Sequence, residues 1–216
     1  MYKPIDIDTL ETNPSFRWWL TRDNFLNKDE CAELRDYIDK NAKVTKGPYD
    51  RPEYSKYKPG MDLWKFYKNN PIVETKLEFE NICTLNTTDI EEQKYLDKIW
   101  TLIKISNSTV YKYNISGIYK NKFMGHRYDN TQWYTPHADF HPIHPHTTIK
   151  LTLLIFLNNE GKDYQGGEFK FFDNTHIKAI EGRALIFPSF AGHEVKPVIS
   201  GNRYSFITWA VGDTFV

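Results

Sequence analysis

The sequence predicts a mostly β fold of the α+β class, in which N-terminal helices support a β-rich second half. Before residue 109, two segments repeat apolar residues with the period of a helix. After it, short apolar runs alternate with turn residues, a pattern typical of an antiparallel sandwich or barrel. The 216 residues include 16% aromatic residues, enough for a compact core. No linker divides the chain, so we expect a single domain over residues 1–216.

The two helices begin at recognisable capping residues. Asn27 followed by Glu30 predicts a helix over residues 27–42. Thr88 followed by Glu91 predicts a second helix over residues 89–105, where apolar residues form one stripe.

A long segment, residues 46–71, separates the helices and mixes prolines, lysines and aromatic residues. Long loops of this kind are either functional lids or disordered, and the aromatic residues favour a lid. We therefore expect residues 1–108 to form helical support with a mobile loop. Tyr57 and Trp64 in this loop are candidate substrate contacts.

Residues 109–216 are expected to form the β core. In the run 148–157, the odd-numbered residues are apolar and predict a core-facing side. The candidate strands are 110–119, 123–128, 148–157, 168–172, 176–180, 184–187, 193–198 and 203–211.

The charge balance argues against a nucleic-acid partner. Lysine and arginine number 28, as do aspartate and glutamate, so the net charge is zero and the general attraction to phosphate is absent. No apolar run is long enough to span lipid, and the first residues do not resemble a secretory signal. We expect a cytoplasmic protein with no membrane association, as a monomer or weak dimer.

Two histidines and an aspartate are the candidate ligands of a metal site that the sequence predicts. His137 and Asp139 are two residues apart, so on an extended backbone their side chains project from the same face about 6.6 Å apart. A third metal ligand must come from another strand, and the downstream candidates are His193 and His176. Two imidazoles and one carboxylate leave open positions that suit Fe(II) with a chelating cosubstrate and oxygen.

Arg203 lies ten residues after His193 and offers a planar fork for the distal carboxylate of a 2-oxo acid. Tyr128 could donate a hydrogen bond to the same carboxylate. A lone pair of His and Asp usually marks a solvated loop, and a lone strand arginine usually forms an ordinary ion pair. The combination within one β pattern favours a site. The run 141–146, with three further histidines, reads as a solvated loop.

These residues give the chain a resemblance to the 2-oxoglutarate and Fe(II)-dependent dioxygenases, in their prolyl 4-hydroxylase-like branch. Segments similar to that branch are residues 23–38, 127–139, 151–172 and 182–212. The resemblance implies a double-stranded β-helix, a jelly-roll fold like that of cupins, with flanking helices.

Position by position, the resemblance implies that His137, Asp139 and His193 bind iron. It implies that Arg203 and Tyr128 bind 2-oxoglutarate. The implied cofactors are Fe(II), 2-oxoglutarate and O2, and ascorbate binding is also implied. Trp209 matches a tryptophan of the oxygen-sensing prolyl hydroxylases and is therefore a candidate substrate contact. Arg203 also resembles the oxygen-sensing enzymes, because collagen-type members use lysine at the cosubstrate position.

The implied function is hydroxylation of prolyl residues in a proline-rich peptide or protein, with release of succinate and CO2. A hydroxylase of a free amino acid or other small metabolite uses the same metal chemistry and stays open. A jelly-roll module that binds metal without catalysis is a third reading, although no ligand is missing. A nucleic-acid demethylase is disfavoured. Those enzymes resemble one another in having a second arginine, and Trp209 occupies that position in this chain.

Overall fold

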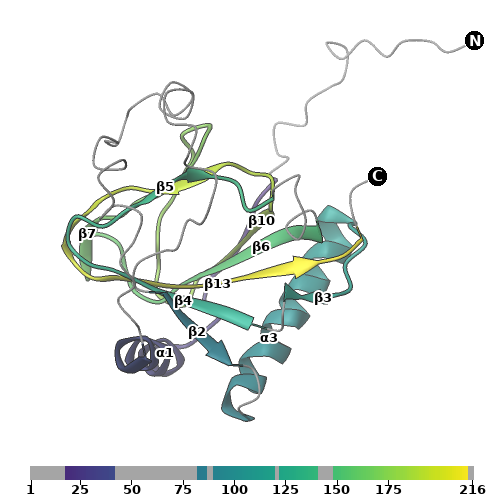
Figure 1. Ribbon diagram of the computed structural model, residues 1–216, viewed down its shortest axis with the longest axis horizontal. Coiled ribbons are helices and arrows are strands. Elements are labelled where there is room, and N and C mark those ends of the chain that lie inside the picture. The colour runs from purple at the N-terminus through teal and green to yellow at the C-terminus, as the bar shows by residue number, and fades with distance from the viewer. Residues whose placement is uncertain (1–17, 42–81, 87–89, 120–121, 141–147, 214–216) are drawn as a thin grey trace, which may run out of the picture.

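A computed structural model describes residues 18–41, 82–86, 90–119, 122–140 and 148–213 (Figure 1). Helix α1 spans Lys28–Asn41 and helix α3 spans Ile90–Ser106, which continues into a π-helical turn, η4, over Asn107–Tyr111. The strands are β1 (Leu20–Arg22), β2 (Ile82–Asn86), β3 (Gly117–Ile118), β4 (Lys122–Tyr128), β5 (Tyr134–His137), β6 (Ile149–Phe156), β7 (Tyr164–Gly166), β8 (Phe169–Phe171), β9 (His176–Ile177), β10 (Ala184–Pro188), β11 (His193–Val195), β12 (Val198–Gly201) and β13 (Arg203–Val211).

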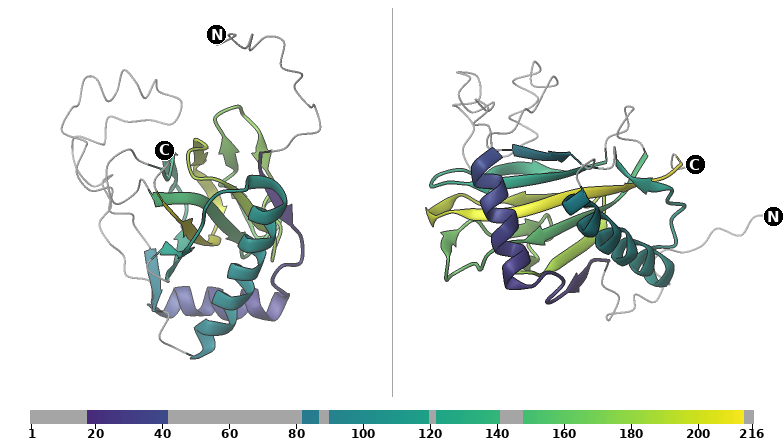
Figure 2. Two further views of the ribbon diagram at one scale, coloured as in Figure 1. Left: turned by 90° about the vertical axis from the view of Figure 1, so that its right-hand side faces the viewer. Right: turned by 90° about the horizontal axis from the view of Figure 1, so that it is seen from below.

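The strands form antiparallel sheets that face each other. The larger sheet has the order β1-β10-β6-β13-β4-β2, with β3 paired to β13 at one end. A four-stranded sheet has the order β5-β11-β8-β9, and β12 pairs with β7. Helices α1 and α3 lie together against one face of the larger sheet (Figure 2). The predicted mostly β, double-stranded β-helix core with supporting helices is confirmed.

Two hydrophobic cores lie on the two faces of the larger sheet. Strand β6 is buried along its whole length. Its odd-numbered residues, such as Leu151 and Leu153, pack in the core beneath the helices, as the sequence predicts. Leu154 and Phe156 instead point between the sheets, where aromatic residues of β8 and β10 join them. The jelly-roll interior is therefore a second, aromatic core.

Strand β13 shows how the pleat places polar groups inside the jelly roll. Tyr204 and Phe206 pack toward the helices, whereas Ile207 points between the sheets. Arg203 has the same parity as Ile207 and is buried with 1% of its surface exposed. Since successive residues alternate between faces, the strand directs a fully buried cation into the interior.

The predicted first helix and its cap are confirmed. The backbone N–H of Asn27 donates to Glu30 Oε2 at 2.8 Å, and the N–H of Glu30 donates to Asn27 Oδ1 at 2.9 Å. This reciprocal pair satisfies two N–H groups that the helix itself cannot bond. The second predicted helix corresponds to α3, and its predicted cap at Thr88 lies outside the described residues.

The predicted strand over residues 110–119 is wrong for most of its length. The chain leaves α3 through η4, and Lys112 then adopts a left-handed conformation with φ of 58°. The side chain of Asn107 bonds both backbone groups of Tyr113, donating to its carbonyl and accepting from its N–H. These local bonds stabilise a turn, and only β3 remains extended.

Predicted strand 193–198 is divided between two sheets. Strand β11 pairs with β5 and β8, whereas β12 begins at Val198 and pairs with β7. Pro197, which has no N–H for a ladder, lies between them. Strand β2 was not expected from the sequence, and it forms the edge of the larger sheet against β4.

Several predictions concern residues outside the described part of the chain. They include the loop 46–71 with Tyr57 and Trp64, and the histidine-rich run 141–146. The single-domain organisation stays a prediction. No helix in the described ranges is both long and apolar enough to cross a bilayer.

Candidate active site

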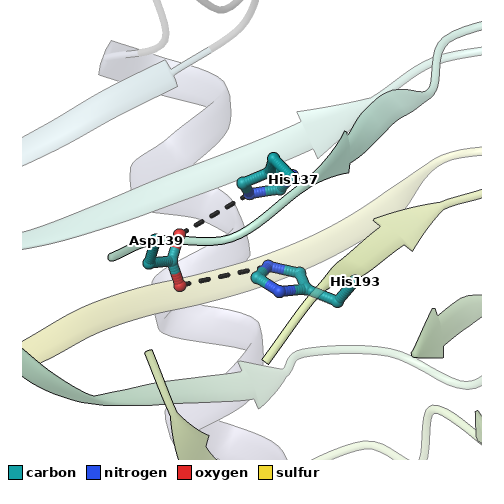
Figure 3. A group of neighbouring side chains, drawn as sticks. All are labelled: His137, Asp139 and His193. Carbon is teal, nitrogen blue, oxygen red and sulfur yellow. Dashed lines mark ion pairs between the residues drawn. The ribbon is translucent and has the colours of Figure 1, made fainter. Parts of the chain in front are cut away.

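Three predicted ligands meet at the end of the jelly roll. His137 ends β5 and His193 begins β11, and the two residues are direct partners in the ladder between these strands. Asp139 follows β5 by two residues. One ligand atom from each side chain lies within 4.8 Å of the others, and Figure 3 shows the carboxylate facing both rings, with one oxygen toward each. His137 Nε2 is 3.5 Å from Asp139 Oδ1, and His193 Nε2 is 4.0 Å from Oδ2.

The alternative third ligand, His176, is elsewhere. Its ring lies 2.9 Å from Glu160 in an ion pair near the surface. The structure therefore favours His193 over His176 as the companion of His137 and Asp139.

Hydrogen bonds with neighbouring groups orient the side chains of His193 and Asp139 for metal binding. His193 Nδ1 lies 2.9 Å from the carbonyl oxygen of Ala191. A carbonyl only accepts, so Nδ1 carries the hydrogen and Nε2 keeps its lone pair toward Asp139. The hydroxyl of Thr152 on β6 donates to Asp139 Oδ2.

The protonation states also suit a cation. Burial, with the nearby His137, lowers the pKa of His193 to about 4, although Asp139 opposes this shift. Burial by itself would raise the pKa of Asp139, but the neighbouring imidazoles and the hydrogen bond from Thr152 hold it below its usual range. At neutral pH the site presents a neutral His193 ring and a carboxylate, which are the forms that bind metal.

Aromatic rings surround the metal ligands. The His193 ring lies 5.0 Å from Phe187 and 5.3 Å from Phe169 between ring centroids. Tyr134 packs on His137 at 4.1 Å. Phe187 and Phe169 thus form an apolar wall beside His193, which limits the access of water to this side of the ring.

Arg203 is the predicted cosubstrate-binding cation, and it lies in the same interior. Its guanidinium carbon is 5.1 Å from the Tyr128 ring centroid and 5.8 Å from that of Phe156. Nη1 donates to Ser205 Oγ at 3.0 Å. Within the described ranges, Nε and Nη2 are buried without a hydrogen-bond acceptor. Because unpaired buried donors are costly, these two N–H groups fit an anionic ligand.

His126 lies near enough to both Arg203 and the metal ligands to interact with their charges. It precedes Tyr128 by two residues on β4, and Tyr128 Oη is 3.5 Å from its Nδ1. Burial, together with the charges of Arg203 and His137, lowers the pKa of His126 to about 3. The charges of Arg203 and of the metal ligands both act on the His126 ring. Arg203 and the metal ligands therefore lie around one interior space.

The structure brings Tyr128 to Arg203, as expected, but its hydroxyl lies nearest to His126 rather than to the guanidinium. Trp209 packs at the edge of the interior core and forms an edge-to-face contact with Tyr119 at 6.1 Å.

Sequence reasoning missed three residues of this site. His126 could have been found, because it shares the inward face of a predicted strand with Tyr128. Thr152 is a polar residue on the same face of β6 as Leu154 and Phe156, but Lys150 is polar there too, so the signal was weaker. Tyr164 lies beside Arg203 but carries no spacing signal that points to it.

Comparisons with known proteins agree with this geometry. Residues 123–211 match the family model described as the 2OG-Fe(II) oxygenase superfamily. A PKHD-type hydroxylase of Psychrobacter sp. (strain PRwf-1) is 42% identical over 62 residues, which cover 27% of this chain and 24% of that protein. A PKHD-type hydroxylase of Alteromonas mediterranea is 34% identical over 91 residues, covering 38% and 40% respectively. The matches thus span well under two thirds of these relatives.

Solved structures show the same fold. A prolyl-4-hydroxylase of Pseudomonas putida superposes with a TM-score of 0.61 at 16% identity, covering 91% of this chain and 93% of that one. The viral collagen prolyl hydroxylase of Paramecium Bursaria Chlorella virus-1, in its 2OG complex, gives 0.60 at 17% identity, covering 92% and 97%. The cofactors of the matched superfamily are Fe(II), 2-oxoglutarate and O2, and the His-Asp-His set fits them. Residues 123–211 therefore match the 2OG-Fe(II) oxygenase superfamily, and the fold is the one seen in prolyl hydroxylases.

Proposed function

We propose that this chain is a dioxygenase that hydroxylates prolyl residues in a proline-rich peptide or protein. One observation carries the proposal: a set of two imidazoles and one carboxylate lies near a buried arginine whose Nε and Nη2 lack acceptors among the described residues. The first set suits Fe(II) with open coordination positions, and the second suits the distal carboxylate of 2-oxoglutarate.

In this proposal His137, Asp139 and His193 hold Fe(II), and Arg203 anchors 2-oxoglutarate. When bound, Fe(II) supplies the chemistry by which O2 oxidises 2-oxoglutarate to succinate and CO2, with one oxygen atom entering succinate and the other a C–H bond of the substrate.

The protein's own groups orient the ligands and exclude water. Ala191 and Thr152 orient His193 and Asp139 through the hydrogen bonds described above. The rings of Phe169 and Phe187 cover the side of His193, so water has little access to it.

A surface cleft that includes Ala191, a neighbour of His193, supports a peptide substrate. The cleft has a volume of about 560 Å³ and is lined mostly by apolar and aromatic residues. It includes Ala191, whose carbonyl accepts the hydrogen bond from Nδ1 of His193, so it lies next to a residue that orients this metal ligand. Phe172 and Phe190 line it while 60% and 56% exposed. Exposed aromatic faces are well suited to receive an extended proline-rich segment.

The names of similar proteins also support this proposal. The PKHD-type relatives are hydroxylases, and the two structural neighbours are a prolyl-4-hydroxylase and a collagen prolyl hydroxylase. For this chain, the prolyl substrate, the products and the monomeric or weakly dimeric state are proposals.

The test compares proline-rich peptides with free amino acids, supplied with Fe(II), 2-oxoglutarate and O2. We expect peptides to stimulate succinate release, and mass spectrometry to show a gain of about 16 Da on proline. If a free amino acid stimulates succinate release and the peptides do not, the small-metabolite alternative is correct.

A further inference from the structure

Tyr164 carries a buried hydroxyl that the proposed site does not yet use. It begins β7, is 2% exposed, and ranks among the largest fully buried side chains. Among the described residues, no group accepts a hydrogen bond from this hydroxyl, and the adjacent Arg203 can only donate to its oxygen. A buried hydroxyl in this condition loses its bonds to water without replacement, so it needs a ligand or an ordered water.

Gly167 shows that Tyr164 and Arg203 lie against each other. A Cβ atom placed on Gly167 would lie 3.1 Å from Tyr164 Cε2 and 3.1 Å from Arg203 Cδ. Its φ of 65° is also one that side chains rarely adopt. The glycine therefore lets both side chains pack against the same backbone position, and it explains why the turn before β8 contains glycine there.

Tyr164 can only act as a donor toward a third group. Burial raises the pKa of its phenol to about 12, opposed by the charge of Arg203, so the hydroxyl keeps its proton at neutral pH. A guanidinium has donors and no acceptor, so the O–H of Tyr164 cannot donate to Arg203. Arg203 Nε and Nη2 also lack acceptors within the described ranges. The phenolic oxygen can accept from the guanidinium, but this leaves the O–H of Tyr164 and at least one N–H of Arg203 without an acceptor.

The other rings around Arg203 do not supply this donor. Phe156 has no hydroxyl, and the Tyr128 hydroxyl lies beside His126 Nδ1. We propose that Tyr164 is the second anchor of the cosubstrate, donating its hydroxyl hydrogen to the distal carboxylate that Arg203 binds. This inference rests on the proposed function, and it gives Tyr164 the role that spacing alone suggested for Tyr128.

The test measures cosubstrate binding without turnover. The Mn(II)-loaded protein is titrated with 2-oxoglutarate by calorimetry, and in parallel with oxalate, which chelates a metal but has no distal carboxylate. Tyr164→Phe removes only the hydroxyl. Tyr204→Phe is the matched control, because Tyr204 neighbours Arg203 on β13 but its hydroxyl bonds Asp39 at 3.0 Å on the other face of the sheet.

We expect Tyr164→Phe to weaken 2-oxoglutarate binding about tenfold to a hundredfold, as for loss of a hydrogen bond to a charged group. Oxalate binding should stay at the wild-type value, and Tyr204→Phe should bind both ligands normally. If Tyr164→Phe does not fold, Tyr164→Met fills the space with a flexible apolar chain and carries the same expectation.

Unchanged 2-oxoglutarate affinity in the Tyr164 variant would overturn this inference and leave the proposed function intact. Equal losses for 2-oxoglutarate and oxalate would also overturn it, because they would reveal a general structural defect. If the wild-type protein binds oxalate but not 2-oxoglutarate, the proposed function itself fails.

Discussion

The hydroxyl of Thr152 donates a hydrogen bond to Oδ2 of Asp139, and so connects the proposed metal site to the centre of the larger sheet. Thr152 is fully buried in β6, where it pairs with Phe187 on one side and Trp209 on the other. Asp139 follows the end of β5, outside any strand. The rigid strand therefore fixes the orientation of a carboxylate that its own backbone segment leaves less constrained.

Thr152→Val should weaken metal binding about tenfold to a hundredfold, because loss of a bond that orients a metal ligand has that effect. Valine has nearly the same shape, but it leaves Oδ2 without its donor. The dissociation constant for Mn(II), measured by calorimetry, tests this. Wild-type affinity in a folded Thr152→Val protein would show that the hydroxyl does not orient the carboxylate.

Arg203→Gln should raise the dissociation constant for 2-oxoglutarate by about 1.5–3 kcal/mol, or roughly tenfold to a hundredfold. The dissociation constant of Arg203→Lys should lie between those of the wild type and Arg203→Gln, since lysine keeps the charge but lacks the planar fork. Mn(II) binding, which does not involve this side chain, is the control. If 2-oxoglutarate titrates Arg203→Gln like the wild type, its carboxylate binds elsewhere.

The metal-free protein should lose stability as the pH falls. The pKa of His126 is about 3 in the folded chain, because of burial and the charges of Arg203 and His137 against that of Asp139, and its unperturbed value is 6.5. Between these values the unfolded chain binds a proton that the folded chain does not, so the free energy of unfolding decreases with decreasing pH. From pH 7 to about pH 5 this group accounts for about 2 kcal/mol.

His126→Gln removes this titration, while His193, whose pKa is also lowered, still contributes. Urea unfolding at the two pH values, compared within each protein, should show a smaller loss in the variant. An equal loss in both proteins would mean that His126 does not supply the pH dependence.

Phe190→Ser should raise the KM for a proline-rich peptide about fivefold, as expected for roughly 1 kcal/mol of lost apolar contact. Phe190 is exposed, so the substitution should leave folding and 2-oxoglutarate affinity unchanged. Steady-state kinetics with the peptide as the varied substrate tests this. An unchanged KM would show that the peptide does not use this cleft.

Strong local patterns were readable from the sequence. Strand β13 has the predicted bounds, because apolar residues run through it and Arg203 begins it. The same is true of the cap at Asn27 and Glu30, whose two bonds form between residues three apart. His137 and Asp139 could be paired by spacing alone, since their geometry depends on a few bonds of backbone.

Long-range relationships were not readable. Tyr164 lies at Arg203 only because of the way the sheets fold, and neither residue indicates the other in sequence. Thr152 in the larger sheet meets Asp139, which follows a strand of the four-stranded sheet, for the same reason. The predicted strand 110–119 was wrong because the side chain of Asn107 bonds the backbone of Tyr113 and stabilises a turn.

Succinate release from 2-oxoglutarate, measured with and without added Fe(II), tests most directly whether the three ligands form a working iron centre. We expect wild-type activity to require Fe(II) and to be inhibited by Zn(II) or Co(II). His137→Ala, Asp139→Ala and His193→Ala should each abolish it, while His176→Ala, altered at a surface ion pair, should retain it. Full activity in metal-stripped protein, or in the His193→Ala variant, would contradict the iron site described here.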